Sequence, residues 1–292
     1  MPIEQINSAL ERIISKNQDI DVLGTGFGTK SDPTEGPLWW KEGKCLLFSD
    51  IGNNRRMKWS LLDGVSVIQQ GTNKANGLTR DPQGRLIACE HSARRVTRME
   101  PDGSITVVAN NYRGLRLNRP NDVVVKSDGS IYFTDPMSSS IDAHSDLDIF
   151  GVYRVSPDLG TINLLVRDFV LPNGLAFSPD ERTLYIDDTR RMHIRAFDLH
   201  PNGTLALATD RVFSRLVGER PGAPDGMKVD LEGNVYCTGP GGVWIIDPEG
   251  EHLGTIVTGE FTTNIGWGGE DWNTLFMTTW SRLCKVQMKI PG

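Results

Sequence analysis

Six oxygen-bearing side chains stand at similar places along the chain, each at the start of a repeated segment. In each repeat an apolar stretch follows, then a turn bearing Gly or Asp, then a second apolar stretch that ends in a polar residue. Carboxylate and amide oxygens without His or Cys suit hard cations such as calcium, magnesium or manganese. If the six side chains meet in space, they form a metal site. They are Glu35, Asn76, Asn121, Asn173, Asp225 and Asn264.

Each of these residues taken singly has a simpler explanation. Asn-Gly and Asp-Gly pairs often form turns, and an Asn before a strand often bonds its own backbone. Recurrence at equivalent positions, with Glu35 and Asp225 as carboxylates among amides, favours the site. Two carboxylates facing each other across a narrow channel repel unless a cation lies between them. The lack of Cys and His in the set argues against a structural zinc site.

The elements that must position these side chains are strands. The segment VVVKSDGSIYFTD from Val123 has two short β-branched and aromatic runs divided by a turn, which is a hairpin pattern. A second turn follows in most repeats, as in EPDGS from Glu100. Two hairpins and a link give four strands, and repeats of this length are typical of propeller blades. We therefore expect an all-β fold, a six-bladed β-propeller with four-stranded blades.

The two ends of the chain are expected to meet. Little chain follows CKVQMKI in the sixth repeat, so a strand within 21–28 is predicted to close the ring and remove its open edges. Residues 21–292 then form a single propeller domain. Residues 1–20 are predicted to be an amphipathic helical segment, because their apolar residues recur at helical spacing. These apolar residues are Ile6, Leu10, Ile13 and Ile14.

Strand topology also predicts a second circle of residues around the channel mouth. The first strand of each blade starts at the mouth, and the second strand runs back to it. The residues that end the second strands are therefore expected at the rim, and the insertion 136–151 is expected to rise from this face as a lid. The rim residues are Asp50, His91, Asp135, Asp188 and Trp280.

Composition excludes several classes of function. The 292-residue chain is 38% hydrophobic and 23% charged with a net charge of −6, which argues against phosphate-backbone binding. No apolar run is long enough for a membrane span, and the start of the chain lacks a signal peptide. A cytoplasmic protein is expected, with its oligomeric state undetermined. Four cysteines without CxxC spacing are expected to be buried free thiols: Cys45, Cys89, Cys237 and Cys284.

The combined motifs resemble a known family. EGPLWW, NRPNDVVVKSDGSIYFTDP, LPNGLAFSPDERTLYIDDT and PDGMKVDLEGNVYCTGPGGVWIIDP are similar, in order, to the senescence-marker-protein-30/gluconolactonase/luciferin-regenerating-enzyme family, in its gluconolactonase-like bacterial branch. The resemblance implies a six-bladed propeller that hydrolyses sugar lactones with the help of a metal. The chain departs from bacterial relatives after FTDP, where it carries Met137 to Asp142, so the substrate is left open.

The resemblance also implies roles for single residues. Glu35, Asn173 and Asp225 match the family's metal ligands, with Asn121 near the metal, and Asp225 matches the proton acceptor. Substrate contacts are implied for Arg119 and Asn121 within the Arg-x-Asn-Asp element that ends at Asp122. The expected cofactor is one divalent cation: calcium first, with magnesium, manganese or zinc as alternatives. The expected partner is a small lactone, with no nucleic acid and no membrane.

The chemistry is consistent without the family. A cation on a lactone carbonyl stabilises the charge that develops in the tetrahedral transition state, and water is the nucleophile. No GxSxG elbow is present, which disfavours an acyl-enzyme. The base is Asp225 or a water acidified by the metal, and His91 is a further candidate for the base or for a substrate contact. The alternatives are an esterase or phosphotriesterase of the same fold and a non-catalytic calcium-binding propeller.

Overall fold

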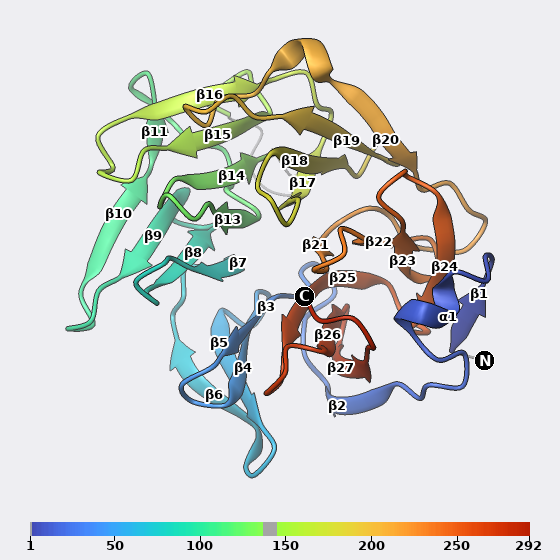
Figure 1. Cartoon of the computed structure of the whole chain (residues 1–292). Helices are drawn as coiled ribbons and strands as arrows, with labels where there is room; N and C mark the ends of the chain where they lie inside the picture. Colours follow the sequence, from blue (N-terminus) through green and yellow to red (C-terminus); the bar gives the residue numbers. More distant parts are fainter. Residues whose placement is uncertain (1, 137–144) are drawn as a thin grey trace.

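The computed structural model describes residues 2–136 and 145–292 and contains six small antiparallel sheets arranged around a common centre (Figure 1). Each sheet is one blade of four strands, with a fifth strand added to one blade. The predicted six-bladed β-propeller is confirmed. Within the described ranges, no helix is long and apolar enough to cross a membrane.

The first three blades follow one another along the chain. Blade 1 contains β3 (Thr34–Trp40), β4 (Cys45–Asp50), β5 (Arg55–Ser60) and β6 (Gly64–Gln70). Blade 2 contains β7 (Ala75–Arg80), β8 (Leu86–Glu90), β9 (Arg95–Met99) and β10 (Ile105–Ala109). A small hairpin, β11 (Asn111–Tyr112) and β12 (Leu115–Arg116), leads to blade 3. Blade 3 contains β13 (Val123–Val125), β14 (Ile131–Asp135), β15 (Gly151–Val155) and β16 (Ile162–Val166).

The remaining blades complete the ring. Blade 4 contains β17 (Pro172–Phe177), β18 (Thr183–Asp188), β19 (His193–Asp198) and β20 (Arg211–Arg215), with the short 3-10 helix η1 (Leu207–Thr209) before β20. Blade 5 contains β21 (Met227–Val229), β22 (Val235–Gly239), β23 (Gly242–Ile246) and β24 (His252–Val257). Blade 6 contains β25 (Thr262–Gly268), β26 (Thr274–Thr279) and β27 (Arg282–Gln287).

The start of the chain closes the ring as expected. Strand β2 (Asp21–Thr25) pairs antiparallel with β27, with Asp21 opposite Lys285 and Thr25 opposite Arg282. It therefore supplies the fourth strand of blade 6, and no edge is left between the last blade and the first.

The first twenty residues differ from the expectation. Only Leu10–Ile13 is helical (α1), and residues Ile3–Gln5 form β1, which adds to the outer edge of blade 5 by pairing with β24. Ile6 precedes the helix and is 63% exposed, so it does not share the buried face. Leu10, Ile13 and Ile14 are buried against blades 5 and 6, and this burial, rather than helix length, holds the segment.

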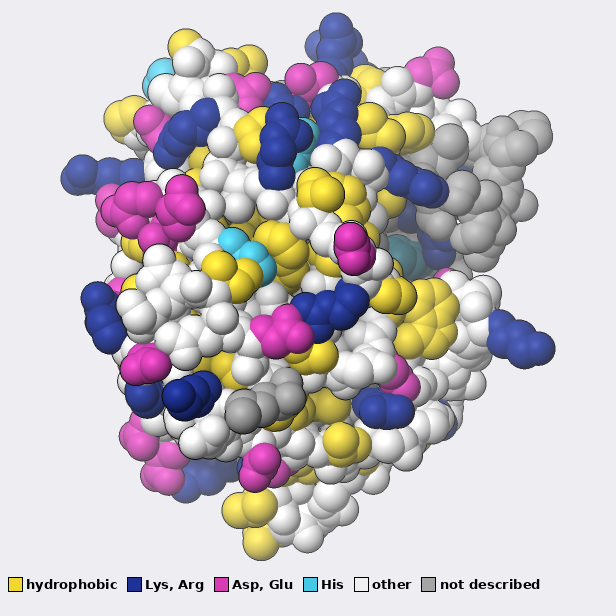
Figure 2. All heavy atoms as spheres, turned by 90° about the vertical axis from the view of Figure 1, so that its right-hand side faces the viewer, with side chains coloured by type: hydrophobic (Ala, Val, Ile, Leu, Met, Phe, Trp, Pro, Cys, Tyr) yellow, Lys and Arg dark blue, Asp and Glu magenta, His cyan; other side chains and the backbone are white. Residues whose placement is uncertain are grey.

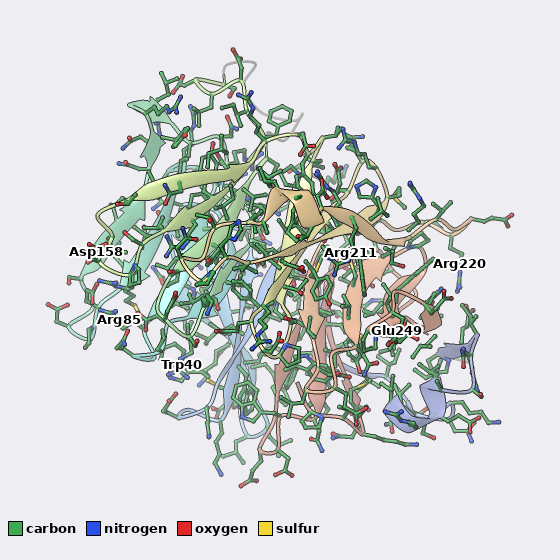
Figure 3. All side chains as sticks on the ribbon, turned by 45° about the horizontal axis from the view of Figure 1, so that its top comes forward. Trp40, Arg85, Asp158, Arg211, Arg220 and Glu249 are labelled. Carbon is green, nitrogen blue, oxygen red and sulfur yellow. The ribbon has the colours of Figure 1, made fainter. Side chains whose placement is uncertain are left out.

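The core lies between the blades, because each sheet buries both faces against its neighbours. Trp39 of blade 1 stacks on Phe276 of blade 6 with ring centroids 5.6 Å apart, and blades 3 and 4 bury Tyr132 in one cluster with Leu184. All four cysteines are buried free thiols, as expected. The six side chains labelled in Figure 3 lie away from the propeller centre, and acidic and basic groups are interspersed on the face shown in Figure 2. The labelled peripheral residues are Trp40, Arg85, Asp158, Arg211, Arg220 and Glu249.

Candidate functional site

Five of the six predicted central residues meet at one end of the propeller axis. Asn76 Nδ2 donates to Asn121 Oδ1 at 2.5 Å, and Asn121 Nδ2 in turn donates to Asn173 Oδ1. Asp225 is near enough to Asn173 and Glu35 for the amide to stabilise its charge and for the carboxylate to repel it. Glu35, Asn76, Asn121, Asn173 and Asp225 come from five different blades, so the repeat positions in sequence become one circle in space.

The glycines that follow these residues permit this convergence. A Cβ built on Gly174 lies 2.2 Å from the backbone oxygen of Asp225, and a Cβ on Gly77 lies 2.7 Å from that of Asn121. Gly77 N–H donates to this Asn121 oxygen at 2.9 Å. The Asn-Gly pairs are therefore not turns. They are places where the innermost strands of neighbouring blades come too close for a side chain.

Asn264 is displaced by one position from its predicted place. Gly226 N–H donates to Thr263 O at 2.8 Å, the same contact that Gly77 makes to Asn121, so Thr263 holds the central position of blade 6. Asn264 lies one residue deeper, where its Nδ2 donates to Glu35 Oε2 at 2.8 Å and to Asp122 Oδ2 at 3.4 Å. The sixth repeat matched the others loosely, and its register was off by one.

Burial and mutual repulsion change the acidity of the central carboxylic acids. Removal from water raises the pKa of Glu35 to about 7, and the charge of Asp122 adds to this effect. Burial also raises the pKa of Asp225 well above its usual range, followed by repulsion from Glu35 and Asp187. Each carboxylate thus makes its neighbours harder to ionise without a counter-charge.

The donor chemistry of the circle fits a hard divalent cation. Glu35 and Asp225 supply two carboxylates, and Asn173 and Asn121 supply amide oxygens. Residues 2–136 and 145–292 contain no group of three or more His, Cys, Asp or Glu arranged to bind a metal. A site built from two carboxylates and amides does not need one, because oxygen donors of mixed charge are what calcium and magnesium take.

Arg119 and His91 lie next to each other at the mouth. Arg119 Nη2 is 3.1 Å from His91 Nδ1, and His91 Nε2 is 3.1 Å from the Asn76 side-chain nitrogen. Guanidinium groups only donate, so Nδ1 accepts and the ring proton lies on Nε2, which then forms no hydrogen bond with the Asn76 amide nitrogen because both are donors. Burial and then the positive charge of Arg119 lower the pKa of His91 to about 3. A neutral imidazole with an occupied lone pair is a poor general base, which counts against His91 as the catalytic base.

The acids that end the second strands do not face the opening, and this part of the rim prediction is wrong. Asp50, Asp135 and Asp188 are fully buried and accept backbone N–H groups from the segments that lead into their own blades. Asp135 accepts from Asn118 at 2.8 Å and from Arg119 at 2.7 Å. These side chains fix loop backbones, since a carboxylate can accept several N–H groups at once.

Asp122 also lies deeper than expected. It takes the position that is Gly77 in blade 2 and Gly174 in blade 4, and it is 3% exposed. One oxygen accepts Val123 N–H at 2.9 Å, and the other faces Asn264. Asp122 therefore belongs to the layer beneath the central circle, while Arg119 and Asn121 stay at the mouth.

Sequence reasoning missed Asp187. It stands where the second strands of blades 3, 5 and 6 carry Thr134, Thr238 and Thr278, and it is fully buried. Its Oδ1 has no hydrogen-bond partner among the described residues. Burial and the charge of Asp122 raise its pKa well above the usual range. The signal was an acid in a column of hydroxyl residues, visible once the repeats are aligned by their second strands.

Two further charged residues at the mouth were missed. Asp32 and Lys74 precede the first strands of blades 1 and 2, and Lys74 Nζ donates to Asp32 Oδ2 at 3.0 Å. The attraction of Asp32 to Arg119 places both beside the predicted substrate residues. Most of the predicted lid, residues 137–144, lies outside the described residues, and the lid stays a prediction.

Comparisons with known proteins agree with this architecture. A profile described as the SMP-30/gluconolactonase/LRE-like region matches residues 33–281. A gluconolactonase of Zymomonas mobilis is 32% identical over 99% of this chain and 87% of its own length. Regucalcin of Danio rerio is 31% identical over 86% of this chain and 83% of its own. The structure of a gluconolactonase from Xanthomonas campestris superposes with a TM-score of 0.88 at 33% identity, covering 99% of this chain and 95% of that one.

Proposed function

The chain belongs to the SMP-30/gluconolactonase/LRE-like family and is a lactonase, a carboxylic ester hydrolase, and we propose that it opens sugar lactones with a divalent cation held by Glu35, Asn173 and Asp225. Asn121 lies beside these ligands and completes the oxygen set. Calcium is the first candidate, because the donors are all oxygen and include only two carboxylates. Magnesium, manganese and zinc are the alternatives.

One observation carries the proposal. Two carboxylic acids, Glu35 of blade 1 and Asp225 of blade 5, are brought together beside two amides, and the charge of Glu35 raises the pKa of Asp225. Such an arrangement is costly in a protein that has no counter-charge to place there. In a protein that binds a cation the same arrangement is favourable, because the cation offsets both the repulsion between the carboxylates and the cost of removing them from water.

The residues of the mouth divide the work of hydrolysis. When bound, a divalent cation supplies polarisation of the lactone carbonyl and stabilises the negative charge of the tetrahedral transition state. Arg119 donates to a hydroxyl or to the ring oxygen of the lactone, and its guanidinium is oriented by His91 Nδ1. Asn121 offers its amide to the same substrate. These contacts place the carbonyl carbon over the central circle.

Asp225 is the proposed proton acceptor. Asp225 would hold the cation and would also accept a proton from the attacking water, because its crowded, buried surroundings oppose the low basicity that a cation would impose. His91 is unsuited to the task because its pKa is about 3. The proton then passes to the leaving alkoxide of the opened ring, so that an aldonic acid is released.

A panel of esters with and without chelator tests the function. Protein stripped with EDTA and then supplied with calcium, magnesium, manganese or zinc is assayed by acid release on aldono-δ- and γ-lactones, phenyl acetate and paraoxon. We expect hydrolysis of the sugar lactones to depend on the added cation and to exceed that of the other two esters. Turnover that is indifferent to chelation contradicts the metal proposal. A preference for paraoxon or phenyl acetate instead favours the esterase or phosphotriesterase alternative.

A further inference from the structure

A buried carboxylate and a half-buried ammonium form a pair beside the proposed substrate residues. Lys74 Nζ lies 3.0 Å from Asp32 Oδ2, and the two side chains are 28% and 10% exposed. Ser31 Oγ donates to the same Asp32 oxygen at 3.1 Å. No hydrogen bond from another described residue reaches Asp32 Oδ1. Lys74 Nζ can therefore still donate further hydrogen bonds, and Asp32 Oδ1 can still accept them.

The backbone that carries Lys74 is held in an unfavourable conformation. Asn73 and Lys74 are consecutive non-glycine residues with φ of 55° and 53°, in the left-handed region that few such residues occupy. Lys74 N–H donates to Asn54 Oδ1 at 2.7 Å, and Ser92 N–H donates to Asn73 O at 2.9 Å. Strain that the surroundings maintain in this way is concentrated at functional sites. Here it aims Lys74 across to Asp32 instead of along its own blade.

The pair adjoins the residues that already face the substrate. Lys74 O accepts the backbone N–H of His91 at 3.3 Å, and His91 in turn contacts Arg119. The charges of Asp32 and Lys74 are both felt by His91, and that of Asp32 by Arg119. This sector of the mouth therefore carries one carboxylate, two positively charged side chains and a neutral imidazole. Sugars are often bound by such neighbouring donors and acceptors, because each hydroxyl both donates and accepts.

We propose that Asp32 and Lys74 form a sugar-recognition subsite that selects lactones with neighbouring hydroxyl groups, Lys74 donating to one hydroxyl oxygen and Asp32 accepting from the next. This inference rests on the proposed lactonase function and names what sets its substrate class. Lys74 and Asp32 hold the polyol part of the ring, while Arg119 and the central circle act on the ester. A lactone without hydroxyl groups gains nothing from the pair.

Lys74→Met tests the subsite on two substrates, D-glucono-δ-lactone and δ-valerolactone, which differ in their hydroxyl groups. Loss of a hydrogen bond to a charged group is expected to lower kcat/KM for the sugar lactone about 10- to 100-fold. The value for δ-valerolactone should change less than about threefold. Lys126→Met is the matched control, because Lys126 also pairs with a carboxylate, Glu181, at 2.9 Å but follows the end of β13 remote from the mouth.

A binding measurement separates this inference from the proposed function. The dissociation constant of D-gluconolactam, a stable analogue, is measured by calorimetry for the wild type, Lys74→Met and Asp32→Asn. Weakening of about tenfold or more in both variants supports the subsite even if no lactone is hydrolysed. Unchanged lactam binding, or no binding to the wild type, overturns it, and so does an equal loss of activity on both lactones. Asp32→Asn keeps the shape of the side chain, so it decides the matter if Lys74→Met does not fold.

Discussion

The carboxylate of Asp135 accepts the backbone N–H of Arg119 at 2.7 Å, so a buried acid at the end of one strand fixes the start of the segment that carries the substrate residues. The same carboxylate accepts Asn118 N–H. Blade 4 repeats the arrangement, with Asp188 accepting the N–H groups of Val170 and Leu171 just before Asn173. Asp135 thus positions the segment that carries the substrate residues, and Asp188 positions the segment that carries the proposed metal ligand Asn173.

We expect Asp135→Asn to raise KM, because an amide can accept only one of the two N–H groups and opposes the other. kcat/KM should fall about tenfold, with metal affinity unchanged. Asp188→Asn is the matched variant, and it should weaken metal binding instead because it releases the segment before Asn173. Titration calorimetry with calcium and steady-state kinetics on one lactone distinguish the two. Equal effects of both substitutions on KM would contradict the division.

Asp225→Asn should abolish hydrolysis while leaving the fold intact. The change removes one charge from the cation site and also removes the proposed proton acceptor, so kcat/KM should fall by about 100-fold or more. The thermal midpoint of the metal-free variant should equal or exceed that of the wild type, since repulsion with Glu35 is gone. Turnover within tenfold of the wild type would show that Asp225 has neither role.

Stability without metal should fall as pH rises. The pKa of Glu35 is about 7 in the folded protein and near 4.5 when unfolded, so the folded state binds more protons between these values. Its contribution is therefore present below pH 4.5 and is lost as pH rises through about 7. In EDTA we expect the thermal midpoint to drop by roughly 5 °C between pH 5.5 and pH 8.

Added calcium should reverse this pH trend, because metal binding requires the ionised carboxylates and releases their protons. Calorimetry in two buffers of different ionisation enthalpy measures the released protons. The Glu35→Gln variant provides the control, in which the pH dependence in EDTA should shrink. A midpoint that rises with pH in EDTA would contradict the acidity assigned to this group.

Gly174→Ala should damage the site from the backbone. The new methyl group meets the backbone oxygen of Asp225 at 2.2 Å, and the two innermost strands must separate to admit it. A loss of about 1–3 kcal/mol of stability is expected, together with weaker metal binding. Gly160→Ala is the control, because its Cβ meets only the exposed side chain of Asp158 at 3.2 Å. Denaturant unfolding and calcium titration measure the two effects.

The features that recur in five or more of the repeats could be predicted from the sequence. The hairpin pattern, the four-strand count and the closing strand within 21–28 all follow from periodicity and turn residues, and the structure agrees. The central circle followed because Glu35, Asn173 and Asp225 hold equivalent places in well-matched repeats. In blade 6 the match was loose, and the central place fell to Thr263.

The contacts that could not be predicted join segments that do not occupy equivalent positions in the repeats. Asp187 is visible as an acid among hydroxyl residues only when the second strands are aligned. Lys74 reaches Asp32 because two successive residues adopt left-handed backbone angles, which Asn73 adopts readily but which a Lys side chain does not indicate. The acids that end the second strands were expected to face the opening. Asp50, Asp135 and Asp188 are instead buried and accept backbone N–H groups.

The pairing of β2 with β27 has a consequence for synthesis of the chain on the ribosome. Thr25 and Arg282 are partners in one sheet, so β2 waits unpaired until the other strands of blade 6 have been made. Strand β1 also waits, since its partner β24 ends at Val257. Contacts of such long range make folding slow and leave strand edges open to other chains in the meantime. Until β27 has been made, the nascent chain therefore carries these unpaired strands and is vulnerable to aggregation.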